Sequence, residues 1–178
     1  YLCAMFPRRS QRRGGEVGGV RRAVHPDTPG PDYGLRVVAQ SQLDEELPEA
    51  DLIALSLPGT PETNKLFSAE RFARCKDGAI LINVGRGNAI DPDGLYKALK
   101  DGHLGGCGLD VTEPEPLPAD SPLWDLENLV ITPHVAGNFF LPETFERIVR
   151  IAGENLAAWA NGTPYRNVVD FTTEYRKQ

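Results

Sequence analysis

Four polar side chains follow three apolar, strand-like runs of the chain, at the points where those runs end. Arg86 stands in INVGRG, Asp110 and Glu115 stand in GLDVTEPEPLP, and His134 stands in ITPHVAG. Taken singly, an arginine after a strand is usually a surface charge, a histidine after a proline is usually a loop residue, and acidic residues in a Pro-rich loop are usually solvated. An arginine, a carboxylate and a histidine at three successive strand ends indicate a site for a proton-coupled reaction on an anion.

Each of these groups has a chemical role that its type suits. The guanidinium of Arg86 can bind a carboxylate through two hydrogen bonds and polarise a neighbouring carbonyl. An imidazole such as that of His134 exchanges protons near neutral pH, since its unperturbed pKa is about 6.5. A nearby Glu115 would favour the protonated ring, which could protonate a carbonyl oxygen while a hydride reaches the carbon. Gly85 and Gly87 leave room for a cofactor to approach the backbone.

Strand-like runs alternate with helix-like segments from about residue 16 onward. Strands are predicted over Glu16–Val20, Leu35–Ala39, Leu52–Leu57, Ala79–Asn83, Gly106–Val111 and Leu129–Thr132. Helices are predicted over Ser41–Leu47 with Ser41 as cap, over Ser68–Arg74, from Asp91 to Gly102, and from near Pro142 to Gly162. This alternation predicts an α/β fold with a doubly wound, mostly parallel sheet, whose ligands bind beyond the carboxyl ends of the strands.

Composition excludes several classes of protein. The 178 residues are 40% hydrophobic, which predicts a folded domain rather than a disordered chain. The net charge of -6 argues against nucleic acid as a partner, and no apolar run is long enough to span a membrane. Cys3, Cys75 and Cys107 form no CxxC pair, so we expect no metal site and no disulfide framework, but free thiols in a cytoplasmic protein.

The first 15 residues are predicted to form an irregular, basic N-terminus. Arg8, Arg9, Arg12 and Arg13 follow a short apolar start, whereas a secretion signal would place its charge first. A frayed end and a nucleic-acid-binding arm are both compatible with this pattern.

The chain resembles the D-isomer-specific 2-hydroxyacid dehydrogenase family from about Glu16 to Asp170. The resemblance lies in LPGTPETNKLF, in GAILINVGRGNAIDPDGLYKALKDGHLGGCGLDVTEPEPLP and in SPLWDLENLVITPHVAG, and is strongest to the glyoxylate and hydroxypyruvate reductases. It implies a Rossmann-like fold, a homodimer, and reduction of a small 2-oxo acid to a D-2-hydroxy acid with NADP or NAD.

The resemblance also assigns roles by position. Arg86 matches the family's substrate-carboxylate arginine, Glu115 the carboxylate that supports the histidine, and His134 the acid/base. The choice of Glu115 over Glu113 rests on its distance from Asp110, which itself matches an aspartate near the nicotinamide or simply caps the Pro-rich loop. The family's cofactor contacts fall on Pro58, Val84, Gly85, Arg86, Asp110, His134, Ala136 and Gly137.

The preference between the two cofactors rests on GGVRRAVHP. In dinucleotide-binding folds the end of the second strand meets the adenosine ribose, where an acidic residue favours NAD and an arginine accommodates the extra phosphate of NADP. Here Val20 is followed by Arg21 and Arg22. The sequence therefore favours NADP, with NAD possible, unless both arginines are merely solvated.

Two features of the family do not appear in this sequence. RRGGEVGG has neither the spacing of GxGxxG nor a strand before it, and no segment corresponds to the family's N-terminal substrate domain. We therefore predict a nucleotide-binding domain over residues 16–162 that lacks the first strand and glycine loop, and a tail over 163–178 that is a remnant of the substrate domain. Weak cofactor binding and slow turnover follow, and a truncated or non-catalytic nucleotide-binding module is the alternative. Formate or alanine dehydrogenase fits the motifs less well.

Overall fold

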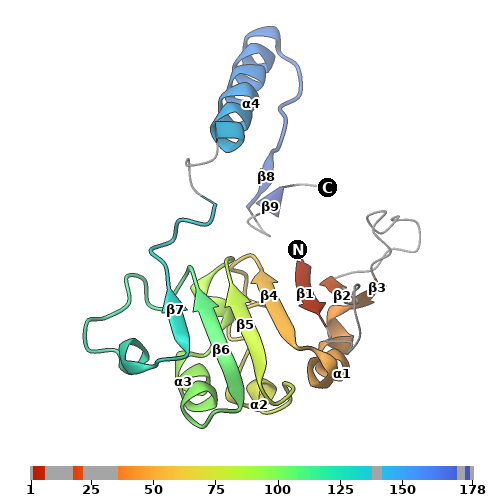
Figure 1. The fold of residues 1–178 in the computed structure, drawn as a ribbon. Coiled ribbons are helices and arrows are strands. Elements are labelled where there is room, and N and C mark those ends of the chain that lie inside the picture. The colour runs from red at the N-terminus through yellow and green to blue at the C-terminus, as the bar shows by residue number, and fades with distance from the viewer. Residues whose placement is uncertain (1, 7–17, 22–35, 138–141, 172–174, 177–178) are drawn as a thin grey trace. The chain divides into compact units, whose positions relative to one another are not determined.

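The computed structural model describes residues 2–6, 18–21, 36–137, 142–171 and 175–176. The chain divides into two compact units, Tyr1–Pro133 and His134–Gln178, and each is described by itself. The first unit is built on a sheet, and the second on one long helix (Figure 1).

The sheet of the first unit has seven strands in the order β3-β2-β1-β4-β5-β6-β7. Strands β4 to β7 are mutually parallel, as are β2 and β3. The prediction of a mostly parallel, Rossmann-like α/β sheet is confirmed. The strands are β1 (Leu2–Phe6), β2 (Gly18–Arg21), β3 (Arg36–Ala39), β4 (Leu52–Ser56), β5 (Ala79–Asn83), β6 (Leu104–Leu109) and β7 (Leu129–Ile131).

Strand β1 corrects the expectation of an irregular N-terminus for residues 2–6 alone, because the rest of that segment lies outside the described residues. Leu2–Phe6 lies between β2 and β4 and is antiparallel to both. Its apolar residues extend the sheet between two strands that would otherwise have open edges. Because Phe6 pairs with Leu52, the first residue of β4, the carboxyl end of β1 lies at the edge where β4 begins. Strand β1 therefore occupies the position in the sheet between β2 and β4, but it runs in the opposite direction to both of them.

Helices α2 and α3 of the first unit begin at residues that cap them. Ser68 accepts a hydrogen bond from the Arg71 amide at the start of α2, and Asp91 accepts one from the Gly94 amide at the start of α3. Ser41 does not cap a helix: it lies inside η1, and the amide of Ala39 donates to the side chain of Gln42 instead. The helical segments are η1 (Gln40–Gln42), α1 (Leu43–Glu46), η2 (Leu47–Glu49), α2 (Ala69–Phe72), η3 (Gly87–Ala89), α3 (Pro92–Lys100) and η4 (Pro122–Asp125).

One face of the sheet forms the core of the first unit. Side chains that alternate along the strands, such as Ile53, Leu55 and Leu81, are fully buried and pack with Phe67 and Phe72. Burying a side chain of this kind stabilises the fold by about 1.5–3 kcal/mol. The core also includes Ala79, Cys107 and Leu109 of the sheet and Leu95 and Leu99 of α3.

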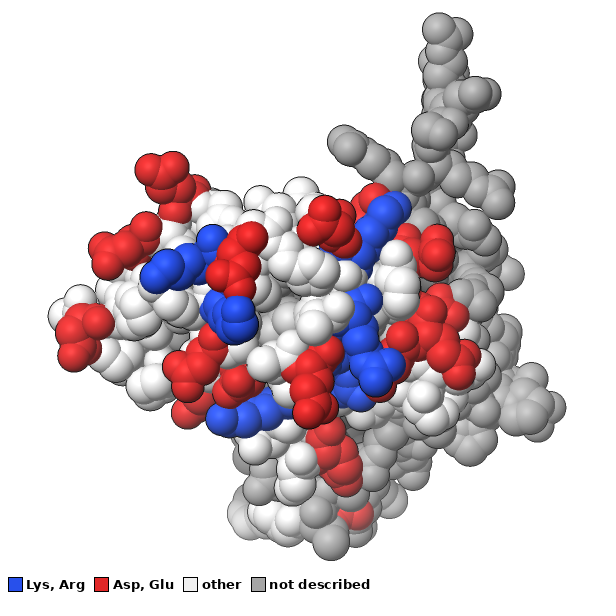
Figure 2. All heavy atoms as spheres, turned by 90° about the horizontal axis from the view of Figure 1, so that it is seen from below, with Lys and Arg blue, Asp and Glu red and all other residues white. Residues whose placement is uncertain are grey.

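The surface that carries α1 and α2 is charged with both signs intermingled, as Figure 2 shows. Asp44 accepts hydrogen bonds from two guanidinium nitrogens of Arg71, at 2.6 and 3.2 Å. Lys76 pairs with Asp51 at 3.0 Å. The first pair connects α1 to α2, and the second connects the start of β4 to the segment before β5.

The second unit consists of α4 (Pro142–Asn161) and a tail that includes the short strands β8 (Val169–Asp170) and β9 (Tyr175–Arg176). The Asn155 side chain holds the tail to the helix, since it accepts from the Arg166 amide at 2.7 Å and donates to the Arg166 carbonyl at 3.0 Å. Five large apolar side chains of α4 are exposed: Phe145, Ile148, Val149, Leu156 and Trp159. Among the described residues, no helix has the length and apolar character needed to cross a membrane.

Candidate active site

The carboxyl ends of β5, β6 and β7 meet at one edge of the sheet, as the sequence predicted. Asn83 pairs with Leu109, which pairs with Ile131. Two backbone hydrogen bonds continue this register past the strands: the Asp110 amide donates to Asn83 O at 2.9 Å, and the Thr132 amide donates to Leu109 O at 2.8 Å. The loops that begin with Val84, Asp110 and Thr132 therefore leave the sheet side by side.

Arg86 is exposed on a turn that buried groups shape. The side chain of Asn83 is completely buried, accepts from the Gly85 amide and donates to the Arg86 carbonyl, both at 3.0 Å. One guanidinium nitrogen of Arg86 donates to Gly85 O at 2.9 Å. A guanidinium has five N–H donors, so most of its capacity is open to a ligand at this exposed position.

Gly85 is required by a close backbone approach. A Cβ at this position would lie 2.5 Å from Leu57 N and 2.6 Å from Leu57 O. The neighbouring loop continues through Pro58, whose carbonyl accepts from the Thr63 hydroxyl at 2.6 Å. A Cβ on Gly59 would lie 3.4 Å from Arg86 Cγ. The loop after β4, which includes the predicted cofactor contact Pro58, therefore packs directly against the arginine turn.

The acidic residues after β6 have different environments. Asp110 is buried, and Thr132 Oγ1 donates to its Oδ1 at 2.5 Å. Glu115 is exposed, and its Oε2 accepts from the Thr112 amide at 3.4 Å. The turn of Gly87 touches this loop, because a Cβ on Gly87 would lie 1.9 Å from Thr112 O. The structure thus brings together the loops of Arg86 and of Asp110 to Glu115.

The remaining predicted residues belong to the second unit, to strand β2, or to the part of the chain outside the described residues. His134 is exposed, has a positive φ of 54° and is the first residue of the second unit, directly after Pro133. Ala136 and Gly137 follow it and are exposed. Arg21 is the last residue of β2, whereas Arg22 lies outside the described residues.

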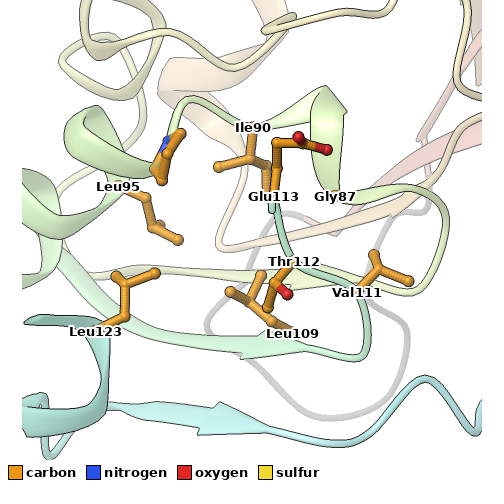
Figure 3. A pocket seen from close by; sticks show the side chains of 9 residues that line it. Gly87, Ile90, Leu95, Leu109, Val111, Thr112, Glu113 and Leu123 are labelled. Carbon is orange, nitrogen blue, oxygen red and sulfur yellow. The ribbon is translucent and has the colours of Figure 1, made fainter. Parts of the chain in front are cut away.

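A largely apolar pocket lies next to the contact between Gly87 and Thr112, and both residues line it (Figure 3). Its walls are built by Leu95, Leu109 and Leu123. None of the predicted catalytic residues lines it, and an apolar wall offers few donors to a pyrophosphate. The full lining is Gly87, Ile90, Pro92, Leu95, Leu109, Val111, Thr112, Glu113 and Leu123.

The edge formed by the carboxyl ends of β5 and β6 fits the nicotinamide half of a dinucleotide better than its pyrophosphate. Val84 is 44% exposed beside the close-packed Gly85, which gives a planar ring an apolar surface near the backbone, and Asp110 lies at the next strand end. The pyrophosphate of a dinucleotide usually binds at a helix N-terminus after the first strand. The segment that follows β1 lies outside the described residues, and β1 itself ends at the opposite edge of the sheet.

Sequence reasoning missed two side chains that shape this edge, Asn83 and Thr63. Both side chains are buried. Asn83 bonds the backbone of the turn that carries Arg86, and Thr63 bonds the backbone of the neighbouring loop after β4. The signal for Asn83 was present: it alternates with Ala79 and Leu81 on the inward face of β5, and a buried amide at such a position must find hydrogen-bond partners.

Residues 6–136 match the sequence pattern of the D-isomer specific 2-hydroxyacid dehydrogenase, NAD binding domain. The chain is 43% identical over 128 residues to a glyoxylate reductase of Korarchaeum cryptofilum and 44% identical over 128 residues to a glyoxylate/hydroxypyruvate reductase B of Escherichia fergusonii. Each match covers 72% of this chain but only 38% and 39% of those relatives. The chain thus spans about two fifths of the length of the curated relatives it matches.

Solved structures show the same likeness. An NADPH-dependent glyoxylate/hydroxypyruvate reductase from Sinorhizobium meliloti, in complex with NADP and sulfate, is 30% identical with a TM-score of 0.76, over 89% of this chain and 49% of that one. A D-isomer specific 2-hydroxyacid dehydrogenase from Xanthobacter autotrophicus, in complex with NADPH and MES, is 37% identical with a TM-score of 0.74, over 86% of this chain and 60% of that one.

Proposed function

Since the chain belongs to the D-isomer specific 2-hydroxyacid dehydrogenase family, we propose that it takes part in the reduction of a small 2-oxo acid, of the glyoxylate or hydroxypyruvate type, to the 2-hydroxy acid. The observation that supports this most is the exposed guanidinium of Arg86. It sits on a turn fixed by Asn83 and Gly85, at the strand edge where α/β sheets bind their ligands.

In this proposal the residues divide the work by chemical type. Arg86 binds the substrate carboxylate through its forked N–H groups and polarises the adjacent carbonyl. His134 gives a proton to the carbonyl oxygen, and Glu115 supports the histidine, a role assigned by resemblance. The nicotinamide cofactor supplies the hydride. Pro58, Val84, Gly85 and Asp110 would hold its nicotinamide end, and Ala136 and Gly137 are proposed contacts by resemblance.

NADP and NAD are both compatible with the family, and we propose NADP as the preferred cofactor. The proposal is supported by Arg21 at the end of β2, where a guanidinium would meet the extra phosphate of NADP. Replacing Arg21 by Asp should shift the ratio of NADPH to NADH affinity towards NADH. An unchanged ratio would show that this arginine is solvated and does not select the cofactor.

The test of the function is glyoxylate-dependent NADPH oxidation by the purified chain and by Arg86→Gln. Loss of the charge-assisted pair should lower kcat/KM for glyoxylate by about 100-fold. The control is Arg74→Gln, which removes an exposed arginine just after α2 and should have little effect. Equal activities of the two variants would contradict the role of Arg86.

A second candidate is a nucleotide-binding module without catalysis, and the match of residues 6–136 to the family's NAD binding domain supports it. Because the carboxyl end of β1 lies where β4 begins, β1 does not lead to the edge with Arg86, where the pyrophosphate of a dinucleotide would be expected, and we expect slow turnover. The variant His134→Ala separates the two candidates. It should abolish reduction if the chain is a reductase, whereas a chain that only binds nucleotide should show no reduction before or after the substitution.

A further inference from the structure

The buried side chain of Asn83 uses both halves of its amide on the turn that presents Arg86. Its Oδ1 accepts from the Gly85 amide, and its Nδ2 donates to the Arg86 carbonyl, each at 3.0 Å. The two partners fix the orientation of the amide, since a backbone N–H can only donate and a carbonyl can only accept. The residue is 0% exposed, so no water competes for either bond.

The same residue also connects the turn to the neighbouring strand end. The carbonyl of Asn83 accepts from the Asp110 amide at 2.9 Å. On the other side, the backbone of Leu57 leaves no room for any side chain at Gly85. The Gly85–Arg86 segment is therefore held from the inside by one amide and from the outside by the loop after β4.

We propose that Asn83 is the positioning residue for Arg86: the acceptor half of its amide shapes the turn at Gly85, and the donor half anchors the Arg86 backbone and so fixes the reach of the guanidinium. The proposal rests on the proposed function, in which Arg86 binds the substrate carboxylate. Asn83 itself touches neither substrate nor cofactor. If Asn83 only stabilised the fold, its loss would lower stability without a specific effect on Arg86.

The two halves of the amide can be separated with one isosteric substitution. In Asn83→Asp the ionised carboxylate still accepts from the Gly85 amide but cannot donate to the Arg86 carbonyl. Its negative oxygen would instead face the partially negative oxygen of that carbonyl and repel it. The protonated acid has the shape of the amide and can do both. Burial disfavours the ionised form, so the acid form and the anchor are present at low pH and are lost as pH rises. The charged residues whose backbone groups bond Asn83 are Arg86 and Asp110, which wild type and variant share.

The expected result is a change in substrate binding rather than in the chemical step. At mildly alkaline pH, Asn83→Asp should raise KM for glyoxylate by about tenfold or more, with a smaller change in kcat. The reason is that Arg86 binds the substrate carboxylate both in the ground state and in the transition state. The KM should return toward the wild-type value as pH falls. Asn83→Ser, whose shorter hydroxyl can serve Gly85 but not Arg86, should show the raised KM without the recovery.

The matched control is Asn128→Asp. The Asn128 side chain also donates to a backbone carbonyl, that of Leu99 at 3.2 Å, but at the amino end of β7. A purely structural role predicts that both variants lose stability and that neither changes KM selectively. That outcome, or a KM for Asn83→Asp that does not depend on pH beyond the wild type, would overturn the proposal.

A second readout separates this proposal from the proposed function. The NMR signal of the Arg86 Nε–H group reports its geometry without any turnover. It should move in Asn83→Asp at alkaline pH, return at acidic pH, and stay in place in Asn128→Asp. If the wild-type chain reduces no glyoxylate, the function fails, but this signal still decides the positioning role. If the Arg86 signal does not change in Asn83→Asp, the positioning role of Asn83 is overturned, whether or not the chain reduces glyoxylate.

Discussion

Replacing Gly87 with alanine would force apart the two loops that form the candidate site in the first unit. The added Cβ would lie 1.9 Å from Thr112 O and 2.2 Å from Thr112 C. Carbon atoms in contact are ordinarily about 3.5–4.0 Å apart, so Thr112 C, at 2.2 Å from the new Cβ, must retreat by roughly 1.3–1.8 Å. Both neighbours are backbone atoms, which cannot rotate away as a side chain would.

The size of the effect follows from that displacement. Overpacking of this kind costs about 1–3 kcal/mol, and each kcal/mol lowers Tm by roughly 2–4 °C in a chain of this size. A misplacement of about 1 Å between reacting groups can cost on the order of 100-fold in rate. Gly87→Ala should therefore lose stability and, if the proposed function is correct, most of the glyoxylate-dependent NADPH oxidation.

The assay pairs urea unfolding, followed by circular dichroism, with the rate of NADPH oxidation. The control is Gly108→Ala in β6, where the new Cβ would meet nothing nearer than Ile82 Cγ1 at 3.9 Å. The same atom is added in both variants, but only Gly87→Ala meets backbone. A Gly87→Ala protein as stable as Gly108→Ala would refute the close contact between the two loops.

Three further predictions follow from single side chains. Thr132→Val, which removes the hydroxyl bonded to Asp110, should lower the free energy of unfolding by about 1–3 kcal/mol, and Thr132→Ser should restore it; equal losses in urea unfolding would argue against the bond. Burial raises the pKa of Cys107 to about 12, so a thiol reagent should label it only as the chain unfolds, and rapid labelling of the native protein would contradict its burial. The hydrogen bond from Lys65 lowers the pKa of Asp91, so its stabilisation is present above the unfolded pKa and is lost as pH falls through the folded one. Asp91→Asn should remove that part of the acid sensitivity in urea unfolding measured against pH, and an unchanged pH dependence would count against the ion pair.

The part of the fold that local sequence patterns determine could be predicted. Strand β5 forms over Ala79–Asn83, as predicted, because an apolar run bounded by glycines has few alternatives to a buried strand. Parallel strands share one edge for their carboxyl ends, so the neighbourhood of Arg86 and Asp110 followed from the order of the runs alone. The cap at Asp91 followed in the same way from its position before Pro92.

Long-range pairing was beyond the reach of local patterns. Leu2–Phe6 gains its place through pairing with Leu52–Ser56, some fifty residues along the chain, and nothing in its own sequence specifies an antiparallel partner. The cap predicted at Ser41 fails for a related reason, since the turn begins earlier and the side chain of Gln42 bonds Ala39. The bonds of Asn83 depend on the path of the turn that follows it, which the residue types alone do not fix.

The central claim is that Arg86 and His134 serve one reduction of one small 2-oxo acid. The most direct measurement uses NADPH that carries deuterium at the transferable position of its ring, incubated with glyoxylate and the purified chain until even slow turnover is visible by mass spectrometry. We predict glycolate with one deuterium on the carbon next to the carboxylate, and loss of that product in both Arg86→Gln and His134→Ala. Unlabelled glycolate only, no glycolate at all, or labelled product that survives His134→Ala would contradict the claim.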